Sequence, residues 1–388
     1  MDTRGIMLFR STIQTGRRGC RPVGKFPIRI AALLVGLATG SVEAGSRDLL
    51  RNEAAIEQAN LDLARLEGNF AQHETAHYVI LYDCDESLAI QRGQLLEKLH
   101  RSYFAFLKKM RIRHHGLQYK QIVIVFEDDK GFNAYARAEG MEPPSGDGYY
   151  LQGYYSSGTN RAAFFNQRAG GAYEASKRKI EDVARQLAAI PGPKNRLVTV
   201  VGPKGPMRVT KGSLADDLVE LKERLIKRFE NENLTVTQHE GAHQLAFNTG
   251  LQSRDHTYPF WVSEGLACMF ESPGSNKGFG AFRVNSKRLG DYRVALARDS
   301  VLGLRGLVSV VPGERVILTD LYAESWALFF FLAKKHPQEL SAYLDDLSDR
   351  EQIGEPNPAT ERLLFERHFK LDESRMEIRW RSFLRALR

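Results

Sequence analysis

The distribution of apolar and polar residues along the first part of the chain predicts a small sheet packed against helices. Two short runs, HYVILY at 77–82 and QIVIVF at 121–126, are apolar and rich in Val and Ile, which is typical of buried strands. A long stretch with helical spacing, 86–110, separates them. The order strand, helix, strand therefore indicates a sheet with helices on its surface.

Further segments extend this pattern on both sides. Helical spacing at 48–66 predicts a peripheral helix before the sheet, and a shorter helix is expected at 130–137. A stretch rich in Gly and Tyr, 146–158, then leads to a predicted strand, RAAFFN at 161–166. These elements make up an N-terminal α/β subdomain, for which we predict the bounds 45–168.

The rest of the chain has a different composition. Residues 169–231 are charged and helical in pattern, broken by Pro-Gly-Pro at 191–193 and by Gly-Pro-Lys-Gly-Pro at 202–206, which predicts an insertion of two helices flanking a hairpin-like turn. Residues 232–388 have mainly helical spacing, including separate helices through the segments described below. The sequence therefore predicts an α+β fold, with a small N-terminal sheet and helices followed by a mainly helical domain.

The first 44 residues have the features of an export signal. Seven Lys and Arg residues precede the apolar run 30–37, and Ser-Val-Glu-Ala at 41–44 follows as a small-residue cleavage pattern. We expect cleavage near Ala44 and a periplasmic or extracellular protein. An uncleaved signal that anchors the protein in a membrane is the alternative, although the run is short for a membrane span.

The leader also accounts for most of the positive charge. Seven of the 55 Lys and Arg residues and two of the 47 acidic residues lie in 1–44, so the net charge of the remainder is +3. Basic and acidic residues are interspersed there, and we expect no nucleic-acid binding. Two cysteines remain, Cys84 and Cys268. They are expected to be separate free thiols, with a disulfide between them as the alternative in an oxidising compartment.

One short segment contains a metal-binding pattern. In Thr237-Gln-His-Glu-Gly-Ala-His-Gln244, the histidines His239 and His243 are four residues apart. Residues at this spacing share one face of a helix, so both imidazoles can reach one metal ion. Glu240, between them, is then the candidate general base for a metal-activated water. An ordinary helix with two incidental histidines is the alternative reading.

A second segment supplies a third candidate ligand. Glu264, in Phe260-Trp-Val-Ser-Glu-Gly-Leu-Ala267, follows His243 by 21 residues, enough for the first helix to end and a second, antiparallel helix to begin. Three protein ligands with an open fourth position are typical of a catalytic zinc site, whereas structural zinc sites use four. The sequence therefore predicts a zinc ion held by His239, His243 and Glu264.

Together the two segments resemble the gluzincin metallopeptidases of the thermolysin and aminopeptidase N type. More narrowly, HYVILYDCDES, QIVIVFEDDKGFNAYA, GYYSSGTNRAAFF, HEGAHQLAFNTGL and FWVSEGLACMFE resemble a bacterial family of unknown function placed in the same clan. The resemblance covers about residues 70–385, apart from the charged insertion. It implies an exported zinc metallopeptidase that hydrolyses a peptide or protein substrate.

The resemblance also implies roles for single residues. His239, His243 and Glu264 correspond to the zinc ligands and Glu240 to the general base. Two further roles are implied, each with a plainer alternative. Glu271, expected two helical turns beyond Glu264, could orient a ligand histidine or be a solvated helix acid. Tyr322, 58 residues after Glu264, could stabilise an oxyanion or be a core aromatic. The strand 161–166 is expected to be the sheet edge that aligns an extended peptide.

Other features limit this interpretation. The glycine-rich motif with which aminopeptidases hold a substrate N-terminus is not recognisable, which argues against exopeptidase activity. A non-catalytic binding or scaffold protein with the same fold is the rival hypothesis. The remaining candidates are expected to be structural, solvated or unassigned: His73, His77, His114, His115, His256, Asn285 and Arg288.

Overall fold

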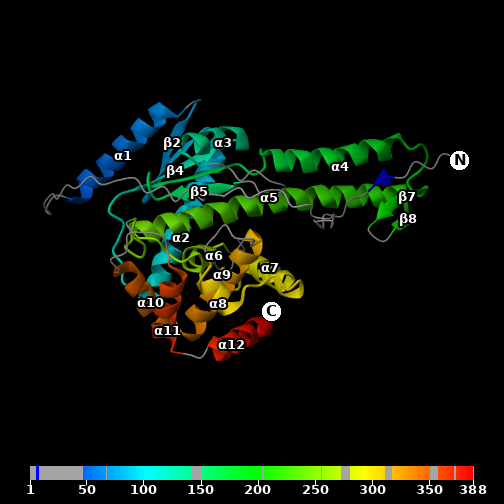
Figure 1. The fold of residues 1–388 in the computed structure, drawn as a ribbon. Coiled ribbons are helices and arrows are strands. Elements are labelled where there is room, and N and C mark those ends of the chain that lie inside the picture. Colours follow the sequence, from blue (N-terminus) through cyan, green and yellow to red (C-terminus); the bar gives the residue numbers. More distant parts are fainter. Residues whose placement is uncertain are drawn as a thin grey trace, which may run out of the picture. The chain divides into compact units, whose positions relative to one another are not determined.

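The computed structural model describes residues 6–7, 47–66, 68–141, 151–202, 205–254, 256–271, 280–310, 317–349, 357–370 and 373–387 (Figure 1). They form two compact units. The smaller unit comprises the described residues within 1–28 and 167–232, and the larger comprises those within 29–166 and 233–388. Apart from β1 (Ile6–Met7), the predicted export signal lies outside the described residues. None of the helices in the described ranges combines the length and the apolar character that a membrane crossing requires.

The larger unit contains a five-stranded mixed sheet with the order β2-β3-β4-β6-β5. Its central strands β3, β4 and β6 are parallel, and β2 and β5 pair antiparallel at the two edges. The prediction that 161–166 forms the edge was wrong, because β5 covers that side of β6. The strands are β2 (Ala71–Glu74), β3 (Tyr78–Tyr82), β4 (Gln121–Phe126), β5 (Gly153–Ser156) and β6 (Arg161–Phe165).

Helices cover both faces of this sheet. Every residue of β3 and β4 is buried, which explains why these strands read as continuous apolar runs rather than as alternating ones. Val79 and Ile124 belong to a small core on one face, with residues of α1 (Arg47–Arg65) and α3 (Asp129–Ala138). Ile80 and Val123 belong to the main core on the other face, which includes α2 (Glu86–Met110) and the C-terminal helices.

The C-terminal part of the larger unit is helical, so the predicted α+β class is confirmed. At its centre lies α9 (Leu318–Lys335), which is buried along most of its length and apolar on nearly all sides. The other helices are the end of α5 (Lys211–Asn248), α6 (Phe260–Cys268), α7 (Ser286–Ala297), α8 (Gly303–Val308), α10 (Pro337–Asp349), α11 (Pro358–Phe369) and α12 (Glu373–Ala386).

The smaller unit consists of α4 (Gly171–Ala189), a hairpin of β7 (Leu197–Gly202) and β8 (Gly205–Thr210), the first part of α5, and β1, which pairs with β7. Tyr173 of α4 contacts Phe229 of α5 with ring centroids 5.2 Å apart. The sequence predicted separate helices for the end of the insertion and for the His-Glu-x-x-His segment. They are one helix of 38 residues instead, because no Gly or Pro interrupts 213–240.

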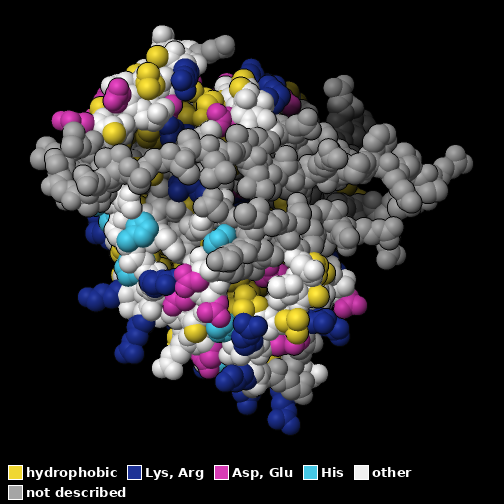
Figure 2. All heavy atoms as spheres, turned by 60° about the vertical axis from the view of Figure 1, so that its left-hand side comes forward, with side chains coloured by type: hydrophobic (Ala, Val, Ile, Leu, Met, Phe, Trp, Pro, Cys, Tyr) yellow, Lys and Arg dark blue, Asp and Glu magenta, His cyan; other side chains and the backbone are white. Residues whose placement is uncertain are grey.

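Charged side chains of both signs are interspersed on the described part of the face shown in Figure 2. Histidine side chains reach the surface of this face in several places. Both Cys84 and Cys268 are buried, separate thiols.

Candidate metal centre

The last part of α5 carries the two histidines and is fixed in place from two sides. A Cβ atom at Gly241 would lie 2.7 Å from Leu99 Cδ2 and 2.8 Å from Leu96 Cδ2, so α2 packs closely on this helix and both leucine side chains would have to shift to admit a larger residue. On the sheet side, the Gln244 amide donates a hydrogen bond of 2.9 Å to the carbonyl of Ile122 in β4. These contacts fix the face of α5 on which His239 and His243 lie.

Glu264 comes from α6, which packs closely on α9. A Cβ atom at Gly265 would lie 2.7 Å from the Ser325 carbonyl oxygen and 2.9 Å from Phe329 Cβ. The two helix backbones can therefore approach only because the residue after Glu264 has no side chain. Trp261, fully buried on the same helix, stacks with Tyr343 of α10 at 5.6 Å.

The three predicted ligands converge. His239 Nε2 lies 2.9 Å from Glu264 Oε2 and 3.1 Å from His243 Nε2. His243 Nε2 and Glu264 Oε2 are 3.4 Å apart. Tetrahedral ligands that bind zinc at about 2.1 Å are separated by about 3.4 Å. The three ligand atoms are thus close to the spacing of three corners of a zinc tetrahedron. We call the residues that carry them, His239, His243 and Glu264, the first cluster.

The chemistry of the first cluster calls for a positive charge at its centre. The Nδ1 atom of His239 lies 2.8 Å from Glu271 Oε1, so a neutral His239 donates from Nδ1 and directs the Nε2 lone pair at the Glu264 carboxylate. Burial lowers the pKa of His239, but its hydrogen bonds with Cys268, Glu264 and Glu271 raise it well above the ordinary value. In the absence of a metal a proton supplies the charge, and a metal ion would satisfy the same demand.

The same histidine contacts lower the pKa of the Glu264 carboxylate. Burial alone would raise the pKa of Glu264, but the charge of His243 and hydrogen bonds with both histidines hold it well below the ordinary value. Glu264 is therefore ionised at neutral pH, as a metal ligand must be. The residues present fit a metal ion that takes two imidazoles and one carboxylate.

Glu271 is held beneath His239 by a buried network. Its Oε2 accepts hydrogen bonds of 2.7 Å from Arg288 Nε and 3.0 Å from Asn285 Nδ2. Burial would raise the pKa of Glu271, but Arg288 and the bond with His239 keep it well below the ordinary value. Glu271 lies beyond the end of α6 at Cys268, so its predicted position two turns along that helix was wrong. Its contact with His239 is the one expected of an orienting carboxylate.

Asn285 and Arg288 were left without a role by the sequence. Asn285 caps α7, since its side chain accepts a bond of 3.2 Å from the Arg288 backbone amide, and its amide nitrogen also reaches the Cys268 carbonyl at 3.1 Å. An Asn followed by helical spacing is an N-cap signal. That signal predicts where α7 starts, but not that the cap and the first turn face Glu271.

Glu240 and Tyr322 are half-buried next to the first cluster. Burial raises the pKa of Glu240, whereas the His239 and His243 charges lower it, and the net shift is upward. The Tyr322 ring lies 5.7 Å from that of His239 and 5.4 Å from that of Phe260. The Arg288 guanidinium lies over its face at 5.0 Å. The cation fixes the Tyr322 ring from one side.

Cys268 is the remaining potential ligand near His239. One ligand atom from each of His239, Cys268 and Glu271 lies within 4.8 Å of the other two. Burial raises the pKa of Cys268 to about 11, so the thiol is protonated at neutral pH and a metal ion would have to displace its proton in order to bind. The structure thus brings together His, Glu and Cys groups suited to a metal, and the first cluster is the better donor set.

The comparisons with known proteins add one match. Residues 233–354 match a family model described as "Protein of unknown function (DUF1570)". A comparison with curated proteins gives no match. The matched segment contains the first cluster together with Glu240, Glu271, Arg288 and Tyr322. It runs from the end of α5 into the residues after α10, so this chain is similar to that family over the candidate metal centre.

Proposed function

We propose that the protein is an exported zinc-dependent metallopeptidase, with His239, His243 and Glu264 as the zinc ligands. The convergence of their three ligand atoms at 2.9–3.4 Å carries this proposal. Two imidazoles and one carboxylate are a ligand set found in catalytic zinc sites, which leave a fourth position open. The resemblance to gluzincins supports the same assignment.

Zinc held there would acidify a water molecule and polarise the carbonyl of a substrate. Glu240 is the group that takes the proton, because it lies between the two histidines in the chain and its pKa is raised toward neutrality by burial. The protonated Glu240 then passes the proton to the amine that leaves. Its raised pKa makes Glu240 a stronger base for the first step.

Tyr322 is proposed to donate a hydrogen bond to the oxyanion that forms on the substrate carbonyl. Two observations support this role. The ring lies near His239 and under the Arg288 cation, and burial raises the pKa of Tyr322 well above its ordinary value. The hydroxyl therefore keeps its proton at neutral pH and remains a donor.

The substrate is proposed to be an extended peptide or protein segment aligned along β5. A Cβ atom at Gly153 would lie 2.6 Å from Val236 Cγ1, so this edge strand closely approaches α5 one turn before His239. A peptide can add to a sheet edge through main-chain hydrogen bonds. Such binding would bring a peptide bond near the first cluster without a pocket for its N-terminus.

A cleavage assay tests the proposal. Purified mature protein with added Zn²⁺ is incubated with a peptide library, alongside Glu240→Gln, and products are identified by mass spectrometry. We expect cleavage by the wild type and a loss of 10² to 10⁴-fold, on the order expected for a general base, in the variant. Equal turnover by the two proteins would overturn the mechanism.

Metal content separates the enzyme from the rival scaffold. Glu240→Gln is expected to keep the zinc of the first cluster, since Glu240 is not a ligand, whereas His243→Ala is expected to lose it. Zinc bound by the wild type without turnover on any peptide of the library would favour a non-catalytic metal-binding protein.

A further inference from the structure

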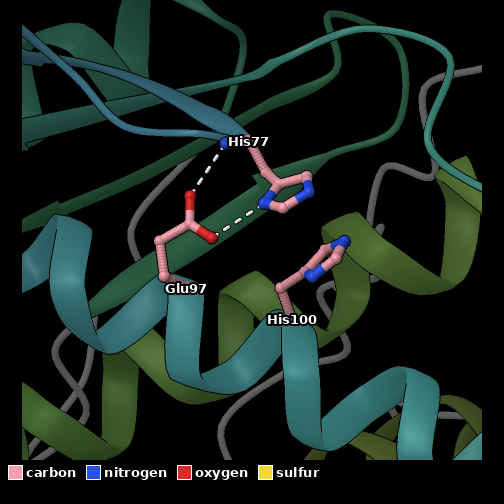
Figure 3. A group of neighbouring side chains, drawn as sticks. All are labelled: His77, Glu97 and His100. Carbon is pink, nitrogen blue, oxygen red and sulfur yellow. Dashed lines mark hydrogen bonds and ion pairs between the residues drawn. The ribbon is translucent and has the colours of Figure 1, made fainter.

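A second group of two histidines and one glutamate lies earlier in the sequence, between residues 77 and 100. His77 is the residue before β3, and Glu97 and His100 lie three residues apart on one face of α2, so all three side chains meet between a strand and a helix (Figure 3). One ring nitrogen of each histidine and one carboxylate oxygen of Glu97 lie within 4.8 Å of one another. We call these residues the second cluster.

Glu97 orients His77. Its Oε2 lies 2.7 Å from His77 Nδ1 (Figure 3). Its Oε1 accepts bonds of 2.8 Å from the His77 backbone amide and 2.7 Å from the Thr75 hydroxyl. Burial would raise the pKa of Glu97, but these hydrogen bonds lower it below the ordinary value. The carboxylate is therefore ionised and fixed, and the His77 ring is held in one orientation.

His100 is packed between two aromatic rings and has a buried nitrogen atom that no described residue hydrogen-bonds. Its ring stacks on that of His77, with centroids 3.7 Å apart and an interplanar angle of 18°. On another side it contacts Phe104 at 4.6 Å. Its Nδ1 atom is buried and has no hydrogen-bond partner among the described residues. A buried polar atom without a partner costs about 1–3 kcal/mol, so its position beside a fixed carboxylate calls for a ligand.

We propose that His77, Glu97 and His100 form a second binding site for a divalent transition metal ion of the Zn²⁺ type. Imidazole nitrogens with one carboxylate favour such ions over Mg²⁺ and Ca²⁺, which prefer oxygen ligands only. Burial and the neighbouring His77 lower the pKa of His100 to about 4, which keeps its ring neutral and able to coordinate at neutral pH.

Metal binding would change the second cluster in a specific way. In-plane lone pairs of two stacked rings run parallel and cannot meet at one ion. The His100 ring must therefore turn about its Cβ–Cγ bond and leave the stack, while Glu97 gives up its bond with His77 Nδ1 to bind the ion. The ion would link the start of β3 to α2. This second site does not depend on the proposed peptidase activity, since none of its ligands belongs to the first cluster.

Zinc stoichiometry tests the proposal. Chelator-treated full-length protein is titrated with Zn²⁺ and, after desalting, analysed by atomic emission. We expect two equivalents in the wild type and one in His100→Phe, which keeps an aromatic ring against Phe104 but removes both nitrogens. His243→Ala is expected to lose the other equivalent. His115→Ala, which changes an exposed histidine outside both clusters, is the matched control and should keep two.

The outcomes are distinct. Unchanged zinc content in His100→Phe would overturn the second site. So would a single equivalent of zinc in the wild type together with none in His243→Ala. That second result would leave the first cluster intact as a zinc site. Glu97→Gln provides a second test should His100→Phe fold poorly by circular dichroism. It should also lose one equivalent, and retention of both would again overturn the proposal.

Discussion

The two clusters contain the same three side chains, two His and one Glu, but differ in what surrounds them. In the first cluster the carboxylate of Glu264 meets the two rings directly, and a second carboxylate, Glu271, supports His239 from behind. In the second cluster Glu97 supports His77 and also lies next to His100. Glu97 is thus both the candidate ligand and the support of a histidine, whereas in the first cluster Glu264 and Glu271 divide these two roles.

This difference has a chemical consequence. Glu97 already accepts three hydrogen bonds within the second cluster, whereas in the proposed mechanism Glu264 binds the metal and Glu240 transfers the proton. The first cluster is also backed by a buried cation, Arg288, and faced by Tyr322. The two proposals thus assign catalysis to one set of two His and one Glu, and only metal binding to the other.

The largest predicted effect concerns the cation behind the first cluster. Arg288→Met leaves Glu271 buried without its ion pair, and breaking a buried pair costs about 3–5 kcal/mol. We expect the free energy of unfolding in urea to fall by that amount, and zinc affinity to fall by roughly 10–100-fold because His239 loses its support. Arg288→Lys should recover part of both. Wild-type stability in the Met variant would show that Glu271 does not need Arg288.

Tyr322→Phe tests whether the first cluster has a catalytic donor that the second cluster lacks. Loss of one oxyanion donor typically lowers kcat by 10²–10³-fold, or about 2.7–4 kcal/mol. We expect a loss of that order in kcat for peptide cleavage, with zinc content unchanged. A variant with wild-type kcat would make Tyr322 a packing residue, which is the plainer alternative.

Gly265→Ala tests the close approach of α6 and α9 that positions Glu264. The added Cβ would meet the Ser325 carbonyl oxygen at 2.7 Å, and overpacking of this kind costs about 1–3 kcal/mol. The melting temperature and the zinc affinity should both fall. Gly290→Ala is the matched control, since a Cβ there meets nothing within 4 Å and α7 should gain up to about 1 kcal/mol.

The smallest effect is expected in the second cluster. Thr75→Val keeps the shape of the side chain but removes a hydroxyl that donates to Glu97 and accepts from the Tyr78 backbone amide. The free energy of unfolding should fall by about 1 kcal/mol, and peptide cleavage should not change. A loss of cleavage would contradict the independence of the two clusters.

Sequence patterns predicted the elements that are long or strongly apolar. The buried strands at Tyr78–Tyr82 and Gln121–Phe126 and the helix α2 were expected within a residue or so of their observed bounds. The edge strands β2 and β5 were missed because each has only four residues and neither is an apolar run. Without β5, the strand 161–166 was wrongly taken for the edge.

The site shows the same limit. His239 and His243 could be paired from the sequence because a helix fixes residues four apart on one face, and the segment around Glu264 suggested a third ligand. The role of Arg288 and the grouping of the second cluster could not be predicted from the sequence, since their contacts join elements whose relative positions depend on tertiary packing. Glu97 and His100 do have the Glu-x-x-His spacing that helical metal sites use. His77, 20 residues earlier, has no such relation to them.

Gln244 links the end of α5, which carries His239 and His243, to the middle of the sheet through the carbonyl of Ile122. An ion bound by α5 and α6 would therefore also stabilise the packing of α5 against the sheet. At 100 times its dissociation constant, a ligand of the folded state adds about 2.7 kcal/mol to stability. If the protein is an exported zinc peptidase as proposed, its lifetime among extracellular proteases would then depend on the supply of free zinc, so that scarcity of the metal would remove the molecule as well as its proposed activity.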